Sequence, residues 1–305
     1  MQKLDGQLIT VIGGGGFVGR YVVEQALARG ARVRIAQRNP HQATFLRPLG
    51  GLGQTQFVRA DVRDAASIAR AVQGSFAVIN LAGSFSDMEA IHVDGAAHIA
   101  DAVRQQGITN LIHLSALGAN PGSGAAYGRS KAAGEAAVRS ACPHAVILRP
   151  SIIFGRDDHF TNMLAAMIRN LLMVPMVHGQ TQVQPVYVGD VAEAIITALE
   201  SKLTGQTLDL GGPQIYTMRD LMHWIANAIG RRRKFVNLPS GLIAALPGAP
   251  IQKDQLNMLQ DDAVLSAGSS GLSALGITPT ALEAVAGEWL LQYRQSGRFS
   301  LKTFA

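Results

Sequence analysis

The sequence has little cysteine and little charge, and each shortage excludes or suggests something. Cys142 is the only cysteine among 305 residues, so an intrachain disulfide and a zinc cluster of cysteines are both excluded. Charged residues make up 16% of the chain, which is well below the roughly one quarter that is usual in soluble proteins. Two explanations stay open: a surface that a partner covers, or simply a composition rich in alanine and glycine.

Long apolar runs are lacking as well. No stretch reaches the roughly 18 apolar residues that a membrane-spanning helix needs. The closest stretch, 163–177, is interrupted by Arg169, Asn170 and Pro175. The first strand is expected within about ten residues of Met1, which leaves no room for a signal or transit peptide. We therefore expect a cytoplasmic protein whose contact with a membrane, if any, is peripheral.

Metal-binding and nucleic-acid-binding patterns are also lacking. The net charge of +6 suits phosphates, anionic lipid headgroups or acidic proteins. The basic residues are scattered without interleaved aromatic residues, so we expect no nucleic-acid partner. The eight histidines form no H-E-x-x-H pattern, and we expect no metal site. The cationic run 231–234 suits either an anionic partner or the solvated end of a helix.

Short apolar runs alternate with helical patterns through the first half of the chain. This alternation is typical of βαβ units, in which helices cover both faces of a parallel sheet. After Pro150 the alternation loosens into longer loops. We predict an α/β fold with a Rossmann-type doubly wound parallel sheet. Residues 1–155 would form the Rossmann domain, and residues 156–305 a smaller α/β C-terminal region on the substrate side, interleaved with the first. The expected strands are 8–12, 32–37, 56–59, 77–81, 111–115, 146–149, 183–188 and 207–210, and the expected helices are 16–29, 41–47, 64–72, 88–106, 125–141, 190–200, 217–229 and 280–295.

A glycine-rich turn follows the first strand. Gly13, Gly16 and Gly19 have a G-x-x-G-x-x-G spacing between a predicted strand and a predicted helix. Gly13 lets the chain leave the strand with an unrestricted φ angle. Gly16 lets a pyrophosphate approach the unpaired N–H groups of the first helical turn, and Gly19 lets the helix pack closely on the strand. We predict a dinucleotide site here that includes Phe17 and Val18.

The end of the second strand predicts which dinucleotide binds. NAD-binding versions of this fold have an acidic residue there, which accepts hydrogen bonds from the adenosine ribose. This chain has Gln37 followed by Arg38. A guanidinium group pairs with a ribose 2′-phosphate in a forked geometry, so we predict that NADP(H) is preferred over NAD(H). The alternative is an ordinary solvated arginine in a turn.

Small, acidic and apolar residues follow the third and fourth strands. Asp61 is placed to accept from the adenine amino group, and Val62 to cover the adenine ring. Leu81, Ala82 and Gly83 let the backbone approach the cofactor. Ligands bind at the carboxyl ends of the strands in such sheets, so we assign all five to the cofactor site.

A possible catalytic group lies further along the chain. Ser115 ends the fifth strand, and Tyr127 and Lys131 lie four residues apart on a predicted helix, so they share one face. An ammonium group lowers the pKa of a nearby phenol, which would make Tyr127 a general acid or base. Ser115 would then bind the reacting oxygen. Lys131 also suits the nicotinamide ribose hydroxyls without any catalysis, and the alternative is a Tyr and a Lys on an ordinary amphipathic helix.

Together these motifs resemble the extended short-chain dehydrogenase/reductase superfamily. Longer blocks, at 113–119, 127–135, 149–158 and 184–192, resemble the nucleotide-binding accessory subunits of respiratory complex I (NADH:ubiquinone oxidoreductase). That resemblance implies a tightly held NADPH with a mainly structural role, and complex I peripheral-arm subunits as partners. It also implies a position close to the membrane, on the cytoplasmic face of the inner membrane. Pro150, Ser151 and Ile152 would flank the nicotinamide, and Pro150 and Ile152 complete the predicted cofactor site.

Two features limit this resemblance. Ser115, Tyr127 and Lys131 are all present, whereas complex I relatives often have an incomplete set. The segment 238–248 is shorter than the amphipathic stretch usual in that family, which puts membrane docking in doubt. A free NADP-dependent oxidoreductase or epimerase and an auxiliary factor of quinone biosynthesis therefore stay open as alternatives, and the sequence leaves undecided whether the chain is an enzyme.

Overall fold

The computed structural model describes residues 3–201, 203–239, 253–266, 268–269 and 271–295. Its centre is a parallel seven-stranded sheet with the strand order β11-β6-β5-β4-β1-β2-β3, so the doubly wound α/β prediction is confirmed. The strands are β1 (Leu8–Ile12), β2 (Arg32–Gln37), β3 (Thr55–Arg59), β4 (Ala77–Asn80), β5 (Asn110–Leu114), β6 (Val146–Pro150) and β11 (Thr207–Leu210).

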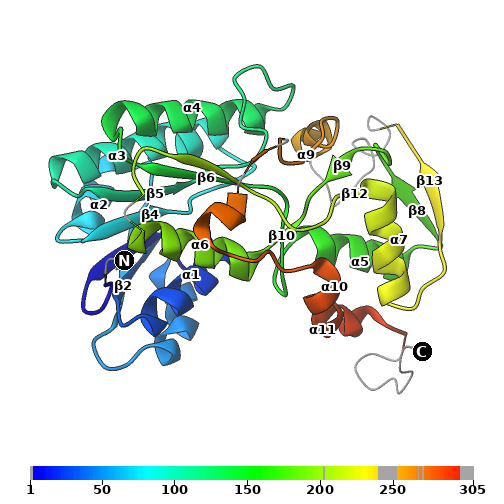
Figure 1. Ribbon diagram of the computed structural model, residues 1–305, viewed down its shortest axis with the longest axis horizontal. Helices are drawn as coiled ribbons and strands as arrows, with labels where there is room; N and C mark the ends of the chain where they lie inside the picture. The colour runs from blue at the N-terminus through cyan, green and yellow to red at the C-terminus, as the bar shows by residue number, and fades with distance from the viewer. Residues whose placement is uncertain (1–2, 202, 240–252, 267, 270, 296–305) are drawn as a thin grey trace.

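Helices cover both faces of this sheet (Figure 1). On one face, α1 (Phe17–Ala28) and α6 (Val188–Glu200) pack against each other over a buried apolar cluster. The other face is covered by α2 (Ala65–Val72), α3 (Gly95–Gln105) and α4 (Ala126–Ala141). Every residue of β4 is buried, as expected for a parallel strand with helices on both sides.

The direction in which the chain adds strands to the sheet reverses at β1. From β1 the chain builds β2 and β3 on one side, then crosses to β4, β5 and β6 on the other. The loops after β1 and β4 therefore diverge and leave a crevice at the carboxyl ends of these strands. Ligands of doubly wound sheets bind at this reversal point.

A second apolar core lies at the other end of the molecule (Figure 1). Its main helices are α5 (Phe160–Asn170) and α7 (Met218–Ala228), which pack against each other. Four short strands and the helix α9 accompany them, and two further strands join this lobe to the sheet. The strands are β8 (Met173–Met176), β13 (Lys234–Asn237), β9 (Gln182–Val183), β12 (Tyr216–Thr217), β7 (Ile153–Phe154) and β10 (Val186–Tyr187), and the helix is α9 (Lys253–Met258). The 3-10 helix η3 (Gly271–Leu275) lies in the first lobe, where it packs against α6 and β11.

The chain passes between the two lobes several times. After building β8 and β9 it returns to the first lobe to form α6 and β11, and then goes back to form α7 and β13. The domain boundary at residue 155 stays a prediction. Most of the segment 238–248 lies outside the described residues.

Three predicted elements differ from the structure. The expected strand 183–188 is wrong: β9 pairs with β12, β10 pairs with β7, and Pro185 between them has no N–H for a ladder. The expected helix 88–106 begins as a π-helix, η2 (Glu89–Asp94), before α3. The expected short helix 41–47 is the 3-10 helix η1 (Pro40–Leu49).

The C-terminal prediction of one helix over 280–295 is also wrong. The structure has three short pieces: α10 (Leu282–Val285), α11 (Gly287–Leu290) and the 3-10 helix η4 (Leu291–Tyr293). Gly287 lies where the first two meet, and glycine is a poor residue for a helix interior. Helix α5 was not predicted, although Leu164, Ala165 and Ile168 have helical spacing and are all buried.

Candidate dinucleotide site

The turn after β1 has the backbone that close approach of a phosphate requires. Gly13 adopts φ 81°, a conformation that favours glycine. A Cβ on Gly19 would lie 2.6 Å from the backbone carbon of Gly14, so only glycine lets α1 pack this closely. A Cβ on Gly16, by contrast, would have only the Gly13 oxygen nearby, at 3.2 Å. The N-terminus of α1 is thus open on the side of Gly16.

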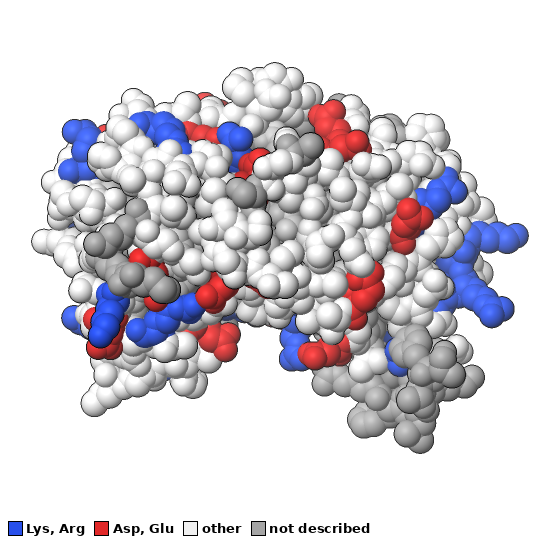
Figure 2. Space-filling view, viewed as in Figure 1, with Lys and Arg blue, Asp and Glu red and all other residues white. Residues whose placement is uncertain are grey.

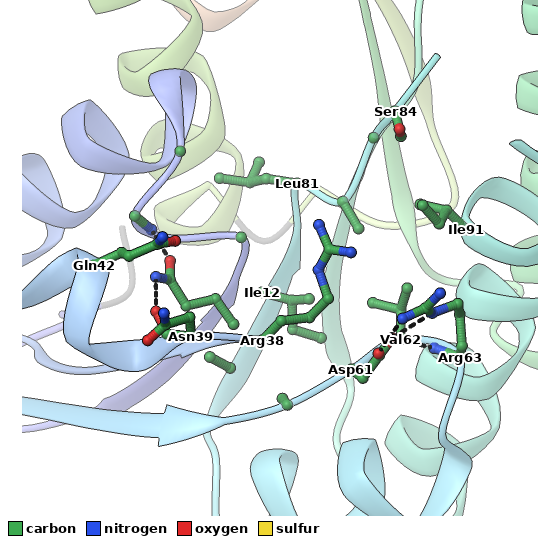
Figure 3. A pocket seen from close by; sticks show the side chains of 18 residues that line it. Ile12, Arg38, Asn39, Gln42, Asp61, Val62, Arg63, Leu81, Ser84 and Ile91 are labelled. Carbon is green, nitrogen blue, oxygen red and sulfur yellow. Dashed lines mark hydrogen bonds and ion pairs between the residues drawn. The ribbon is translucent and has the colours of Figure 1, made fainter. Parts of the chain in front are cut away.

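Gln37 is held by the protein itself. Its Oε1 accepts a hydrogen bond from the Gly15 N–H at 3.0 Å, and its Nε2 donates to the Asn39 oxygen at 2.6 Å. The side chain therefore ties the glycine turn to the end of β2. Arg38, the next residue, lines a cavity at this strand end, and Figure 3 shows its side chain pointing into it.

A cavity of about 620 Å³ opens beside the glycine turn (Figure 3). It joins the carboxyl ends of β1, β2, β3 and β4, and its volume is within the range of small-molecule sites. Nine of the predicted cofactor residues line this cavity: Gly13, Gly16, Gln37, Arg38, Asp61, Val62, Leu81, Ala82 and Gly83. The sequence did not single out Ile12, Gly15, Ala36, Asn39, Gln42, Ala60, Arg63, Ser84 and Ile91, which also line it.

Asp61 is paired with a neighbour that the sequence analysis missed. Arg63 donates from Nε to Asp61 Oδ1 at 3.0 Å and from Nη2 to Oδ2 at 2.7 Å. This side-chain pairing lowers the pKa of Asp61 to about 2, so the carboxylate stays charged. Each of its oxygens can still accept a further hydrogen bond. The two-residue spacing Asp-x-Arg after a strand was the available signal.

Lys131 lies beyond this cavity, in a nearly dry position. It is 4% exposed, and its Nζ donates to the Leu114 oxygen at 3.1 Å. Burial lowers its pKa to about 8. A Cβ on Gly83 would lie 3.7 Å from Nζ, so the small residue leaves the ammonium group near the wall of the cavity.

The catalytic role of Tyr127 stays a prediction, and its surroundings do not favour the phenolate. Burial raises the pKa of the phenol to about 12, whereas an activated phenol would have a lowered value. The Lys131 Nζ lies 5.8 Å from the centre of the Tyr127 ring, over its face. Ser115 Oγ is buried and has no hydrogen-bond partner among the described residues. The three residues lie at one end of β5 and α4, outside the lining of the cavity.

Two rings enclose Tyr127. Phe85 stacks on it with ring centres 4.6 Å apart, and His92 meets it edge-on at 5.2 Å. Burial lowers the pKa of His92 to about 3, so the imidazole is neutral. Its Nε2 accepts from the Ser84 N–H, and its Nδ1–H therefore donates to Ser130 Oγ. Neither Phe85 nor His92 lies in one of the motifs that predict the site.

Gly19 and the four remaining predicted residues also lie outside the lining of the cavity. The ring of Phe17 approaches Gly155, and Val18 packs against the apolar cluster under α1. Pro150 ends β6, where its oxygen accepts from the Leu117 N–H, and Ile152 packs on the second apolar core. These four residues therefore flank the boundary between the two lobes.

The residues present fit a nicotinamide dinucleotide. The open N-terminus of α1 suits a pyrophosphate, and the cavity between Arg38 and Asp61 suits an adenosine. The buried, unpartnered Ser115 Oγ is an orphan that a ligand oxygen or amide would satisfy. When bound, such a cofactor supplies hydride chemistry, while these residues bind and orient it.

Comparison with known families agrees with this geometry. The chain belongs to the NAD dependent epimerase/dehydratase family, whose sequence model matches residues 9–211. A UDP-glucose 4-epimerase of Thermus thermophilus, solved in complex with NAD, is 25% identical, with a TM-score of 0.68 over 90% of this chain and 94% of that one. Nicotinamide dinucleotide binding is thus a property of the family.

The curated relatives narrow the class. The chain is 38% identical to "NADH dehydrogenase [ubiquinone] 1 alpha subcomplex subunit 9, mitochondrial" of Mus musculus, over 96% of this chain and 82% of the relative. It is 31% identical to the "NADH-ubiquinone oxidoreductase 40 kDa subunit, mitochondrial" of Neurospora crassa, over 98% and 83%. A ceramide reductase of Caulobacter vibrioides is 28% identical over 78% of this chain and 76% of that protein.

In the described part of the chain, no helix combines the length and apolar character needed to cross a membrane.

Proposed function

We propose that this chain is a nucleotide-bearing accessory subunit of respiratory complex I. The observation that carries the proposal is its likeness, along nearly the whole chain, to relatives whose names place them in that complex. A bound dinucleotide joins the ends of four strands and the start of α1, so its binding energy adds to the stability of the fold. The nucleotide in this proposal is a structural ligand.

The preferred nucleotide is NADP(H). Arg38 follows β2 directly, and its guanidinium group points into the cavity (Figure 3). Gln37, in the place of the acidic residue of NAD-binding sites, brings no negative charge against a 2′-phosphate. A guanidinium group and a phosphate form a charge-assisted, forked pair. Arg63 adds a second cation to the same wall.

The surroundings of Tyr127 support a structural role over turnover. A general acid or base is most effective when its pKa is near the working pH, and the pKa of about 12 is far above it. Phe85 covers one face of the phenol ring. The second candidate, a free NADP-dependent oxidoreductase, is favoured by one observation: the buried Ser115 Oγ has no partner among the described residues and is available to a substrate oxygen.

A surface on the second lobe suits contact with an anionic membrane. Leu171, Leu172 and Met173 are consecutive and 41%, 78% and 62% exposed. Met173 begins β8, and its partner in β13 is the exposed Lys234. The exposed Arg232 precedes β13 by two residues. Figure 2 shows cations gathered at this end of the molecule. Apolar side chains flanked by cations are the pattern that peripheral membrane proteins use.

Purification from native membranes tests the proposal. A tagged chain, expressed in its own organism, is recovered after mild solubilisation, and its partners and bound nucleotide are identified by mass spectrometry. Recovery with complex I peripheral-arm subunits and one NADP(H) per chain is the expected result. Tyr127→Phe, which keeps the ring, should give the same recovery, whereas Gly16→Val should lose the nucleotide. Recovery of the chain alone, with a readily exchanged nucleotide, would refute the proposal and point to the free oxidoreductase.

A further inference from the structure

Helix α4, which carries Tyr127 and Lys131, has no N-terminal cap of its own. Ala125 precedes it in an extended conformation and offers no side-chain acceptor. The cap comes from far along the chain. Asp254 Oδ1 accepts from the Ala126 N–H and Oδ2 from the Tyr127 N–H, both at 2.8 Å. A carboxylate in this position satisfies two orphan donors and faces the positive end of the helix dipole.

Asp254 belongs to a segment that connects the two lobes, which we call the strap (residues 254–265). Figure 1 shows its helix α9 between α4 and β9. Beyond α9, the oxygen of Leu259 accepts from Thr181 Oγ1 at 2.7 Å, and Ala263 exchanges backbone hydrogen bonds with the strand at β9. Leu256 is buried against Val177. One end of the strap is thus fastened to the second lobe, and Asp254 fastens the other end to α4.

The start of α4 is connected to the wall of the dinucleotide cavity. Ser130 lies one turn into the helix, and its hydroxyl donates to the backbone carbonyl oxygen of Tyr127. The same hydroxyl accepts from His92 Nδ1, and His92 Nε2 accepts from the Ser84 N–H. Ser84 lines the cavity. A shift of the first turn of α4 therefore moves Tyr127 and, through His92, the cavity wall.

We propose that Asp254 is a positioning residue of the dinucleotide site. Its carboxylate holds the first turn of α4 in place, so that the strap must be seated for Tyr127, Lys131 and Ser84 to take their positions around the nucleotide. Anything that lifts the strap then loosens the nucleotide. This inference rests on the proposed dinucleotide binding. It implies that the second lobe, through the strap, affects how tightly the nucleotide binds.

The experiment compares Asp254→Ala and the milder Asp254→Asn with a matched control, Thr217→Ala. Thr217 caps α7 by accepting from the Asp220 N–H, in the second lobe and outside the lining of the cavity. Both alanine variants lose one helix cap and should lower Tm to a similar extent. NADPH affinity of the full chain is measured by titration calorimetry, and hydrogen exchange is followed for peptides that cover α4 and the strap.

Asp254→Ala should weaken NADPH binding about 2- to 30-fold, which corresponds to the loss of one cap, and Asp254→Asn should weaken it less. Thr217→Ala should leave the affinity within about twofold of the wild type, since α7 contributes no residue to the lining of the cavity. Bound NADPH should slow exchange in the strap of the wild type but not in that of Asp254→Ala. Equal affinities in Asp254→Ala and Thr217→Ala would overturn the proposal.

A local cap separates positioning from general damage. Ala125 already has the extended backbone of an N-cap, with φ −89° and ψ 137°, so Ala125→Ser can supply an acceptor there. Added to Asp254→Ala, it should restore both the slow exchange of the first turn of α4 and the NADPH affinity, while the strap stays loose. Restored protection without restored affinity would contradict the proposal.

The outcome stays distinguishable from failure of the proposed function. If the wild type binds no nicotinamide dinucleotide, the proposed function fails, and exchange in the unliganded proteins still tests Asp254. Exchange at residues 126–131 should then be about 2- to 30-fold faster in Asp254→Ala than in Thr217→Ala. Equal exchange would show that the carboxylate does not hold this turn.

Discussion

Lys131 carries a cationic side chain in a part of the fold that is almost inaccessible to solvent. Burial lowers its pKa from 10.5 to about 8. Between these values the unfolded chain binds a proton that the folded chain has released, so the free energy of unfolding rises with pH. The full cost of the buried charge is therefore present below about pH 8. Above pH 10 the raised pKa of Tyr127, about 12, acts in the opposite direction.

The pH dependence of stability measures this cost. From pH 8 to pH 10, the free energy of unfolding of the wild type should rise by about 2 kcal/mol relative to Lys131→Met, which has no group to titrate there. Denaturant titrations at pH 8, 9 and 10 give the difference. The exposed Lys3→Met should follow the wild type. A constant difference between the wild type and Lys131→Met would show that Lys131 keeps its proton throughout.

Arg38 is the residue on which the choice of cofactor depends. Arg38→Gln should weaken NADPH binding about 10- to 100-fold, since it removes a charge-assisted pair with the 2′-phosphate, and should leave NADH affinity within about twofold. Fluorescence titration of both cofactors measures this. Arg104→Gln, which breaks a surface pair with Asp101 outside the cavity, is the control. An equal loss for both cofactors would place Arg38 on a part of the dinucleotide that they share.

At the scale of elements, two glycines of the turn between β1 and α1 are expected to have different roles: Gly19 allows close packing, and Gly16 allows the dinucleotide to approach. Gly19→Ala would press a methyl group onto the backbone of Gly14, which should lower the free energy of unfolding by about 1–3 kcal/mol even without nucleotide. Gly16→Ala meets little protein, so it should cost about 1 kcal/mol at most and act mainly on dinucleotide affinity. Thermal melts with and without NADPH distinguish the two.

Gly124→Ala provides the control for these glycine variants, because a Cβ at Gly124 has no neighbour within 4 Å. Its melting curve should match that of the wild type, with the same increase in Tm on adding NADPH. If Gly16→Ala kept that full increase, the phosphate would lie elsewhere than at the start of α1.

For the whole molecule, the exposed residues of the second lobe predict binding to anionic lipid. Replacement of Arg232 and Lys234 by Gln should weaken co-sedimentation with phosphatidylglycerol-containing vesicles about 10- to 30-fold, since each surface cation contributes about 1 kcal/mol. Leu172→Ser should weaken co-sedimentation with these vesicles both at low salt and at high salt. Leu52→Ser, at a fully exposed leucine in the other lobe, is the control. Wild-type binding no stronger than that to neutral vesicles would refute the membrane contact.

Local patterns predicted much of the fold. The strands and helices of the first lobe arise from apolar runs and helical spacing close in sequence, so their order and the parallel sheet were predictable, with the helix ends adjusted by a few residues. Nine predicted cofactor residues line one cavity because they follow consecutive strands of one sheet. Elements shorter than about five residues, such as β7, β9 and α10, leave too little periodicity to recognise.

Properties of the site that depend on distant residues were not predictable. A four-residue spacing placed Tyr127 and Lys131 on one face, but burial of the phenol raises the pKa of Tyr127, and the Lys131 ammonium group lies 5.8 Å from the centre of its ring. Phe85 lies 42 positions before the ring that it covers, and Asp254 lies 127 positions after the amide that it caps. Nothing in the local sequence around either residue indicates its partner.

The sequence by itself determined the doubly wound class, the glycine turn and the residues at the strand ends, because propensity and periodicity act over a few neighbouring residues. Only the tertiary structure decided the protonation of Lys131 and Tyr127, the enclosure of the phenol and the source of the cap on α4. These depend on desolvation and on contacts between distant segments, which exist only after the chain has packed.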